Sequence, residues 1–330
     1  MAEFDRIDPR DVRIFSGSSN PALAEAIARY LQVPLDPSRS RRFSNDNLYI
    51  QLGASVRSRA VFIVQSLGPP ADQHVLELLM MLDTARTAGA REVHAVIPYF
   101  SYARSDKKDA PRISIAGRLM ARLIETAGAT HVMTMSLHAP QVHGFFDVPT
   151  DPLTARPIFE EYFKKQDLSR TVVVAPDGGR ARSASRFASR LGLPVAVGSK
   201  TRMSDREVRL TGIIGNVSGQ RRAIIYDDEI ASGSSAAAMA KLLIAQGVED
   251  IASVCTHGVF AGDSVAQLTA IPQLTQIVTS DTVAIPESKR TPQMHVLPVA
   301  PLFGEAIRRN YLRESIGDLF TFWEDFQAED

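Results

Sequence analysis

Short runs of β-branched and other apolar residues alternate along the chain with longer segments of helical periodicity, and this alternation constrains the fold most. The predicted strands are VRIF at 12–15, VFIVQS at 61–66, EVHAVIPY at 92–99, HVMTMSL at 131–137, TVVVAPD at 171–177, RAIIYDD at 222–228, IASVCTH at 251–257 and QIVTS at 276–280. Strands that alternate with helices build βαβ units and a mainly parallel sheet rather than a sandwich. The sequence therefore predicts an α/β fold.

The chain is long enough for two domains, since 330 residues exceed the ordinary size of one. The proline-containing stretch DVPTDPLTARP separates two strand-rich halves, which predicts an N-terminal domain at 1–154 and a C-terminal domain at 155–330. Segments of both halves share the order of helix end, glycine, turn, buried strand and polar loop. This order is typical of any αβ unit and also of a duplicated domain, so both interpretations stay open. The tail, APLFGEAIRRNYL then SIGDLFTFWEDF, is predicted to form two closing helices, which could pack back on the first domain.

Composition excludes several classes of protein. With 37 Lys and Arg against 37 Asp and Glu, the formal net charge is zero, which excludes a polycation built to bind nucleic acid or acidic lipid. The single cysteine, Cys255, excludes an intramolecular disulfide and a cysteine-based zinc site, and its place inside a predicted strand indicates a core residue. No apolar run approaches the roughly 18 residues of a membrane span, and the first residues include acids where a signal peptide would be apolar. We expect a cytoplasmic protein without membrane or nucleic-acid partners.

The most informative segment is AIIYDDEIASGSSAAAMAKLLIAQG, in which an apolar strand ends in Asp227 and Asp228 and a loop of small residues opens a helix. Paired carboxylates can accept hydrogen bonds from the vicinal hydroxyls of a ribose, or hold Mg²⁺ through water. The backbone N–H groups and hydroxyls of Ser232–Ser235, at a helix start, can surround a phosphate dianion. A solvated turn that caps a helix is the alternative. The segment favours a sugar-phosphate site.

A second phosphate loop is predicted at VVVAPDGGRARSASRFASRLG. Here Asp177 ends a strand, Gly178 and Gly179 allow the backbone to approach a ligand, and Arg180 supplies charge. An ordinary glycine-rich turn is the alternative. Neither a Walker-type motif nor a G-x-G-x-x-G motif after a strand occurs, which argues against P-loop and dinucleotide-binding interpretations.

Two polar loops follow strands in the first half. The loop in VIPYFSYARSDKKDAPR carries Arg104 and Lys107 beside aromatic residues, which could stack a base and neutralise a polyphosphate, although a solvated charge cluster has the same composition. The segment TMSLHAPQVHGFFDVPTD places His138 after a strand, with Asp147 and Asp151 close behind it. A lone histidine is usually structural, but a histidine with acids at a strand edge can bind Mg²⁺ at a phosphate or assist proton transfer.

Motifs from both halves of the chain occur together in the order found in one known family. They are SNPALAEAIA, RRFSN, VFIVQS with HVLELLMMLD, VIPYFSYARSDKK, ETAGATHVMTMSLHAPQVHGFFDVP, VVVAPDGG, SKTR, IIYDDEIASGSS, CTHGVFAG and LPVAPLFGEAI. Over nearly its entire length the chain resembles the ribose-phosphate pyrophosphokinases, also called phosphoribosyl pyrophosphate synthetases. The resemblance implies two tandem phosphoribosyltransferase-type domains, each a mainly parallel sheet flanked by helices, in a homo-oligomer, either hexamer or dimer. It also implies transfer of the pyrophosphoryl group of ATP to the 1-hydroxyl of ribose 5-phosphate, with Mg²⁺ as cofactor and AMP as second product, for nucleotide biosynthesis.

The resemblance also implies roles for individual residues by position. Residues implied to bind ATP are Phe43, Asn45, Asn47, Arg104, Ser105, Asp106, Lys107 and His138. Residues implied to bind ribose 5-phosphate are Asp227, Asp228, Ala231, Ser232, Gly233, Ser234 and Ser235. The implied metal site comprises His138, Asp177, Asp147 and Asp151. The implied catalytic residues are His138 with Lys200 and Arg202, the last two on a polar loop expected to be mobile and to cover the reacting groups. A solvated hairpin is the alternative for this polar segment.

Several positions depart from the family pattern. Asn45 and Asn47 stand where FSDGE has acids, Ser136 stands for the acid of DLHA, PDGGR replaces PD-x-GG, and Ala231 stands for an acid in DD-x-x-DT-x-GT. Arg104, His138, Lys200 and Arg202 favour an active synthetase. Two alternatives stay open: a non-catalytic homologue that regulates a true synthetase, and a phosphoribosyltransferase or kinase with an altered substrate.

Overall fold

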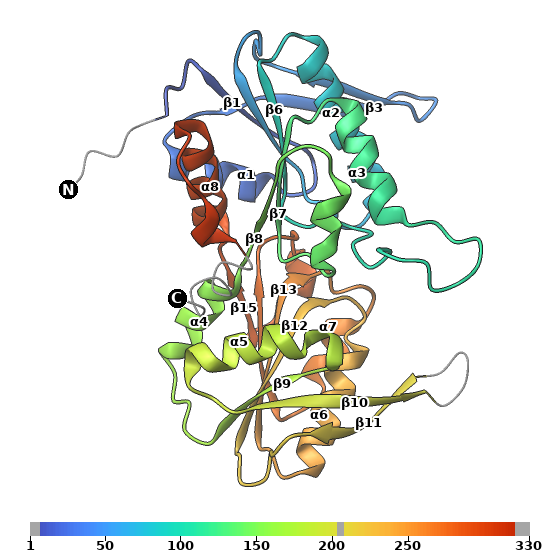
Figure 1. Ribbon diagram of the computed structural model, residues 1–330, viewed down its shortest axis with the longest axis vertical. Helices are drawn as coiled ribbons and strands as arrows, with labels where there is room; N and C mark the ends of the chain where they lie inside the picture. Colours follow the sequence, from blue (N-terminus) through green and yellow to red (C-terminus); the bar gives the residue numbers. More distant parts are fainter. Residues whose placement is uncertain (1–6, 203–207, 321–330) are drawn as a thin grey trace, which may run out of the picture. The chain divides into compact units, whose positions relative to one another are not determined.

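The computed structural model describes residues 7–202 and 208–320, with the backbone alone for 200–202 and 208–210 (Figure 1). The chain divides into two compact units. Unit 1 contains the chain up to Thr154, the segment Thr282–Ala284 and the part that begins at Pro298. Unit 2 contains Ala155–Asp281 and Ile285–Leu297.

Unit 1 is built on a six-stranded sheet in which every neighbouring pair is parallel. The spatial order is β2 (Leu35–Asp36), β1 (Val12–Ser16), β5 (Ala60–Val64), β6 (Glu92–Ile97), β7 (His131–Met135) and β8 (Thr150–Leu153). Helices α2 (Ala71–Thr87) and α3 (Ala116–Ala127) cover one face, while α1 (Pro21–Leu31) and α8 (Ala300–Leu312) pack together on the other (Figure 1). The antiparallel hairpin of β3 (Ser38–Arg42) and β4 (Leu48–Leu52) and the 3-10 turns η1 (Pro140–Phe145) and η4 (Gly317–Leu319) complete the unit.

Unit 2 is built on a seven-stranded sheet that is parallel except for the pair β10–β11. The spatial order is β11 (Val208–Ile214), β10 (Val195–Arg202), β9 (Thr171–Ala175), β12 (Arg222–Ile230), β13 (Asp250–Gly258), β14 (Leu274–Ser280) and β15 (Met294–Leu297). Its helices are α4 (Arg156–Lys164), α5 (Ala181–Leu191), α6 (Ser234–Ala245) and α7 (Ser264–Thr269), with the 3-10 turns η2 (Gly178–Arg180) and η3 (Glu287–Lys289).

The two sheets share one topology. In unit 1 the first strand, β1, lies between β2 and β5, and β6, β7 and β8 follow outward; in unit 2 the first strand, β9, lies between β10 and β12, and β13, β14 and β15 follow outward. Two tandem domains of one type, each a mainly parallel sheet flanked by helices, confirm the predicted α/β fold. In each sheet the second strand lies on one side of the first strand, and the later strands are added on the other side. The first strand therefore marks a topological switch point. Ligands of open α/β sheets bind at such a point, at the carboxyl ends of the strands.

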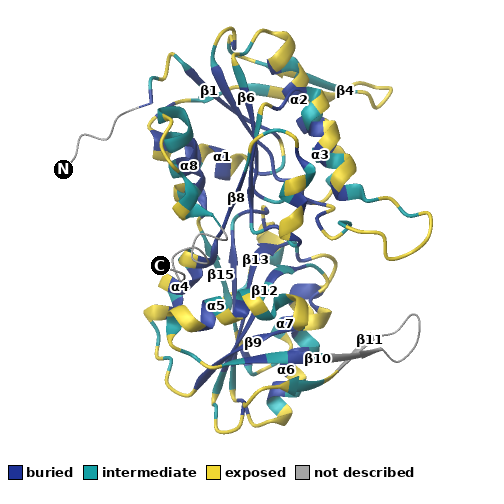
Figure 2. Ribbon diagram, viewed as in Figure 1, coloured by how far each residue is buried: buried dark blue, intermediate teal, exposed yellow. Residues whose placement is uncertain are grey.

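The core of each unit lies where helices cover the central strands. Every residue of β5 and of β9 is buried (Figure 2). Parallel strands covered on both faces carry continuous apolar runs, which explains why these segments were predicted from sequence. Two helices have clear caps: the Asn20 side chain accepts a hydrogen bond from the Leu23 N–H at the start of α1, and Gly128 ends α3 with φ of +119°.

All eight predicted strands are present. The structure also contains β2, β3, β4, β8, β10, β11 and β15, of which all but β10 are short, polar or at sheet edges. The predicted strand 222–228 continues to Ile230, since β12 pairs with β13 up to Ile230 and Gly258. The second predicted closing helix is not found in 315–320, where a 3-10 turn leads to a bridge between Phe320 and Leu153; its remaining residues lie outside the described range. In 7–202 and 208–320 no helix has the length and apolar character needed to cross a membrane.

Candidate active site

The carboxyl edge of the unit 2 sheet at the switch point brings two predicted loops together. Strands β9 and β12 are parallel neighbours, and their pairing ends at Val174 and Ile225. The turn that follows β9 therefore runs beside the last residues of β12 at one edge. From the turn after β9, this edge holds Asp177 and Arg180. From β12 and the segment after it, the edge holds Asp227, Asp228 and Ser232–Ser235, which we call the serine loop.

The paired carboxylates lie within β12 rather than after it. Asp227 pairs with Cys255 of β13, whereas on the β9 side the ladder has already ended. The backbone N–H of Asp228 donates to Oδ1 of Asp227 at 2.8 Å. Asp228 is only 7% exposed. Two adjacent acids are thus fixed on a strand that is paired with β13 on one side and extends past the end of its ladder with β9 on the other.

The electrostatics of this pair are unfavourable without a ligand. Burial, followed by the neighbouring Asp228, raises the pKa of Asp227 well above its usual range. The Arg180 guanidinium opposes this effect, with Nη1 at 3.5 Å from Oδ2 of Asp228. Hydroxyl groups or cations supplied by a ligand would stabilise the ionised carboxylates further, as expected for a binding site.

The serine loop joins β12 to the 12-residue helix α6. Gly233 has φ of +75°, and a Cβ built there would lie 3.4 Å from the Ser264 and Leu268 side chains. The hydroxyls of Ser232 and Ser234 are 2.9 Å apart. Because the first N–H groups of a helix have no intrahelical acceptor, and the helix dipole is positive at this end, the loop is suited to bind a phosphate.

Hydrogen bonds and packing hold the serine loop in place. Its first residues bond to the segment after β13, through Phe260 N–H to Ile230 O at 3.0 Å and Ala261 N–H to Ala231 O at 2.9 Å. Helix α6 is anchored by buried residues that include Met239 and Leu243. The N–H groups at the start of α6 are therefore held in place by the core of unit 2.

The turn after β9 exposes backbone. The Asp177 carboxylate accepts from the Gly179 N–H at 3.0 Å and so fixes the start of the turn. A Cβ built at Gly178 would meet nothing within 4 Å, and one at Gly179 would meet only Oδ1 of Asp177, at 3.2 Å. Packing within unit 2 therefore does not explain these glycines, whereas close approach of a ligand to the backbone would.

Lys200 and Arg202 lie in a β-hairpin and not in the loop that the sequence predicted. Their backbones belong to β10 and pair with Leu210 and Val208 of β11, with a register shift after Ser199. The structure therefore has the hairpin that the sequence left open as the alternative to a loop. Residues 203–207 lie outside the described range, so the predicted mobility is not tested.

In unit 1, the predicted nucleotide residues Phe43, Asn45 and Asn47 lie in the turn of the β3–β4 hairpin. The Phe43 ring is 47% exposed and packs edge-on against Tyr49, with centroids 5.6 Å apart. The Arg41 guanidinium lies 5.2 Å and 4.8 Å from the two ring centroids. Oδ1 of Asn45 accepts from the Asn47 N–H at 3.2 Å and shapes the turn. The hairpin presents an aromatic surface on which a base could stack.

The loop between β6 and α3 carries the other predicted nucleotide residues. Arg104 and Lys107 are exposed. The Ser105 hydroxyl donates to Ser114 O at 3.1 Å and accepts from the Ala116 N–H at 3.2 Å, so Ser105 shapes the loop. Asp106 accepts from the Gln141 side chain. The structure thus provides two exposed cations at the carboxyl edge of the unit 1 sheet.

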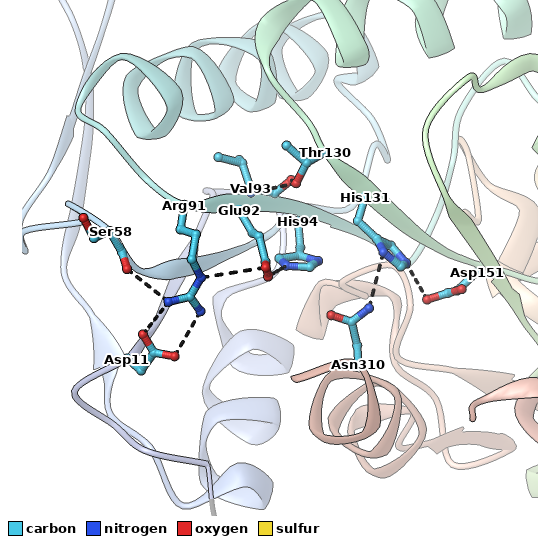
Figure 3. A network of polar contacts seen from close by, with 10 residues as sticks. All are labelled: Asp11, Ser58, Arg91, Glu92, Val93, His94, Thr130, His131, Asp151 and Asn310. Atoms are coloured by element: carbon cyan, nitrogen blue, oxygen red, sulfur yellow. Dashed lines mark hydrogen bonds and ion pairs between the residues drawn. The ribbon is translucent and has the colours of Figure 1, made fainter. Parts of the chain in front are cut away.

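Of the predicted metal residues in unit 1, the structure does not bring Asp151 to His138. Strand β7 runs from His131 to Met135, and His138 follows its carboxyl end. Asp151 lies near the start of β8, where its Oδ2 is 2.6 Å from Nε2 of His131 (Figure 3). Because β7 and β8 are parallel, Asp151 lies toward the amino edge of the sheet. Asp147 is exposed, and its backbone N–H donates to Glu125.

The sequence did not reveal the polar network around His131. Nδ1 of His131 is 3.3 Å from the side-chain amide nitrogen of Asn310 (Figure 3). Arg91 donates from Nη1 to Oδ1 of Asp11 at 2.8 Å and from Nη2 to Oδ2 at 3.0 Å (Figure 3). These side chains, with His94 and others, line a pocket of about 760 Å³. They come from strand starts and from α8, so no local motif signals them.

Comparison with known proteins agrees with these features. The family described as the N-terminal domain of ribose phosphate pyrophosphokinase matches residues 12–128, and the phosphoribosyl synthetase-associated domain matches 200–321. A Streptomyces coelicolor protein is 47% identical over 94% of this chain and 98% of its own length. The ribose-phosphate pyrophosphokinase of Deinococcus radiodurans is 45% identical over 93% of this chain and 97% of its own. The crystal structure of phosphoribosylpyrophosphate synthetase from Mycobacterium smegmatis superposes with a TM-score of 0.86 at 34% identity, covering 92% of this chain and 99% of that one. The chain belongs to the ribose-phosphate pyrophosphokinase family.

Proposed function

We propose that the protein makes 5-phosphoribosyl 1-pyrophosphate from ribose 5-phosphate and ATP, with AMP as second product and Mg²⁺ as cofactor. The observation that carries this proposal is the fixed Asp227–Asp228 pair beside the serine loop, at the switch point of the unit 2 sheet. Membership of the ribose-phosphate pyrophosphokinase family supports the same reaction. The proposal extends to nucleotide biosynthesis in the cytoplasm by a homo-oligomer, hexamer or dimer.

Ribose 5-phosphate would bind to unit 2. Its phosphate would accept hydrogen bonds from the N–H groups and hydroxyls of Ser232–Ser235, aided by the dipole of α6. Its vicinal hydroxyls would donate to Asp227 and Asp228, which are already oriented by β12. These contacts would account for the buried Asp228 and the partly buried Asp227, which would otherwise destabilise the sheet edge.

ATP would bind through residues of unit 1. The exposed Phe43 ring would stack on the adenine, beside Asn45 and Asn47. Arg104 and Lys107 would neutralise phosphate charge, with Ser105 and Asp106 shaping their loop. His138 would also face the phosphates, as the resemblance implies.

In the proposed reaction the 1-oxygen of ribose 5-phosphate attacks the β-phosphorus of ATP. The bond between that phosphorus and the oxygen bridging to the α-phosphorus breaks, AMP leaves with the bridging oxygen, and the proton of the 1-hydroxyl is released. Phosphoryl-type transfers depend on positioning and on charge neutralisation more than on covalent chemistry. Lys200 and Arg202 would neutralise charge that develops on the transferred group.

The residues present fit a Mg²⁺ cofactor. Mg²⁺ prefers oxygen ligands and is commonly held by one or two carboxylates together with substrate phosphates and water. In unit 2, Asp177 offers a carboxylate at the carboxyl edge, beside exposed glycine backbone. When bound there, the ion would neutralise phosphate charge. Among the residues described, no group of three or more His, Cys, Asp or Glu side chains could hold a metal ion by itself.

Incubation of the purified protein with ribose 5-phosphate, ATP and Mg²⁺ tests the proposal. We expect equimolar AMP and 5-phosphoribosyl 1-pyrophosphate, followed by ³¹P NMR, and no AMP when ribose 5-phosphate is omitted. An assay in excess chelator should abolish both products. Absence of both products in the complete assay would overturn the proposed reaction.

The departures from the family pattern favour one second candidate, a non-catalytic homologue that regulates a synthetase. Ala231, Asn45, Asn47 and Ser136 each stand where the family pattern has an acid. Calorimetry separates the two functions, because a regulatory homologue would bind ribose 5-phosphate or ATP without forming AMP.

A further inference from the structure

Phe260, in the segment after β13, has a strained backbone. Its φ is +44°, a left-handed conformation that bulky residues rarely adopt, and the residue is only 1% exposed. Such strain persists where the surrounding structure holds the residue in place, and it is concentrated at functional sites. The Phe260 N–H donates to Ile230 O at 3.0 Å, which attaches this segment to the last residue of β12. The strained residue is therefore bonded to the strand that leads into the serine loop.

The side chain of Lys289 holds the carbonyl end of Phe260. Lys289 is the last residue of the 3-10 turn η3, and its half-buried side chain donates from Nζ to Phe260 O. Buried Ile285, just before this turn, belongs to the core of unit 2. Among the residues that the structure describes, no carboxylate forms an ion pair with Lys289. The cation is thus directed to a backbone carbonyl, in a charge-assisted hydrogen bond.

Two peptide groups connect Lys289 to the serine loop. Phe260 O and the Ala261 N–H belong to one trans peptide group, so they point in opposite directions. The Ala261 N–H donates to Ala231 O at 2.9 Å. Ala231 O in turn belongs to the same peptide group as the Ser232 N–H. Because both peptide groups are planar, the hydrogen bond from Lys289 constrains the direction of the Ser232 N–H.

The Ser232 N–H is available to a ligand. In the described part of the chain no group accepts a hydrogen bond from it, whereas the Ser232 hydroxyl lies 2.9 Å from that of Ser234. A hydrogen-bond chain that begins at a cation polarises each successive N–H, which strengthens the last donor toward an anion. A phosphate at the serine loop would therefore meet a donor that Lys289 both orients and polarises.

We propose that Lys289 is a positioning residue of the sugar-phosphate site, which orients and polarises the Ser232 N–H toward the 5-phosphate through two peptide groups. This inference rests on the proposed function of the serine loop. Lys289 acts without touching the ligand, because its effect passes through the backbone of Phe260 and Ala231. If Lys289 only stabilised unit 2, its loss would lower Tm without changing the affinity of the folded protein.

Isothermal titration calorimetry with ribose 5-phosphate and with ATP tests the proposal in Lys289→Met, Lys289→Arg and, as a matched control, Arg290→Met. The control removes the neighbouring cation, which is exposed and pairs with Glu287 at 3.3 Å. We expect Lys289→Met to lower the affinity for ribose 5-phosphate by about fivefold or more, and the affinity for ATP by less than about twofold. Lys289→Arg keeps a cationic donor and should recover part of the loss, and Arg290→Met should change neither affinity.

Steady-state rates give a second readout. Lys289→Met should raise the KM for ribose 5-phosphate by a similar factor and change kcat by less than about twofold, because the loss concerns ground-state and transition-state binding of the 5-phosphate alike. A fall in Tm with unchanged KM and unchanged affinity would show a purely structural role and overturn the proposal.

Amide hydrogen exchange of the ligand-free protein separates the backbone relay from a direct effect of charge. The Ala261 N–H should exchange about fivefold faster or more in Lys289→Met than in wild type, and at the wild-type rate in Arg290→Met. Weaker binding of ribose 5-phosphate with unchanged exchange would mean that the charge acts through space, and would overturn the relay. Failure of the wild-type protein to bind ribose 5-phosphate would instead overturn the proposed function, and this inference with it.

Discussion

Replacement of Asp227 by asparagine should stabilise the protein and weaken ribose 5-phosphate binding at once. Burial and the adjacent Asp228 raise the pKa of Asp227, so its ionised form destabilises the folded state. Asparagine has the same shape and keeps the acceptor for the Asp228 N–H, which now donates to Oδ1 at 2.8 Å. The Asp227→Asn variant therefore removes a charge without removing a contact.

The magnitude follows from the geometry. Two like charges about 5 Å apart repel by roughly 3 kcal/mol at an effective dielectric constant of ~20. The Arg180 guanidinium at 3.5 Å from Asp228 offsets part of this repulsion. A net gain of about 1–2 kcal/mol remains, and at about 2–4 °C per kcal/mol it should raise Tm by about 3 °C or more. The lost charged acceptor should weaken ribose 5-phosphate binding by about tenfold or more.

The sign of the pH dependence provides a second check. Well below pH 4 the carboxyl is protonated in both the folded and the unfolded state, and Asp227 costs no stability. As pH rises, the unfolded state loses the proton first, because the pKa of Asp227 is raised in the folded state. The Tm difference between Asp227→Asn and wild type should therefore be small near pH 4.5 and largest near pH 8.

Scanning calorimetry at both pH values and titration with ribose 5-phosphate measure these effects. The control is Glu249→Gln, which removes the same charge at an exposed ion pair with Arg221 and should change Tm and affinity little. A Tm that falls in Asp227→Asn, or a difference that does not grow with pH, would refute the electrostatic argument. An unchanged affinity would refute the assignment of Asp227 to the sugar hydroxyls.

Four further substitutions test other parts of the structure. Lys200→Ala and Arg202→Ala should each lower kcat by about 10², near 3 kcal/mol, with smaller effects on KM; steady-state rates that match wild type would contradict their role. Gly233→Ala should raise the KM for ribose 5-phosphate and cost about 1–2 kcal/mol of stability in urea unfolding, because φ is +75°. Glu305→Gln should cost about 1 kcal/mol at pH 7, since hydrogen bonds from Arg308 hold the pKa of Glu305 at about 2. That loss should disappear as pH falls from about 4.5 toward 2, and a loss that persists in acid would count against the ion pair.

The strands that sequence predicted and those it missed differ in what defines them. Strand β9, TVVVA, is buried on both faces and is visible as an apolar run. Strand β3, SRSRR, is almost fully exposed and exists because it pairs with β4. The backbones of Lys200 and Arg202 likewise lie in a strand that is recognised by its pairing with β11, because their polar segment contains no apolar run. Pairing between distant segments leaves no trace in local hydrophobicity.

The candidate site shows the same division. Asp227 and Asp228 were predictable because adjacent acids after an apolar run are visible in sequence. Asp151 was grouped with His138 because only thirteen positions separate them, but a parallel strand must begin at the edge opposite to the one where its neighbour ended. Sequence proximity therefore misplaced Asp151, whereas the contact of Arg180 with Asp228 joins residues 48 positions apart and follows only from the order of the strands.

Two departures from the family pattern change the charge of one sheet edge in the same direction. Ala231 removes an acid from the loop that follows Asp227 and Asp228, and Arg180 adds a cation on the other side of the pair. An acid at 231 would have raised the pKa of Asp227 further, while Arg180 lowers it. The two carboxylates that are proposed to face the sugar hydroxyls can thus stay ionised with fewer cations from outside the chain. The departures therefore constitute a coherent change in how this edge balances the charge of a sugar phosphate, rather than separate losses from one site.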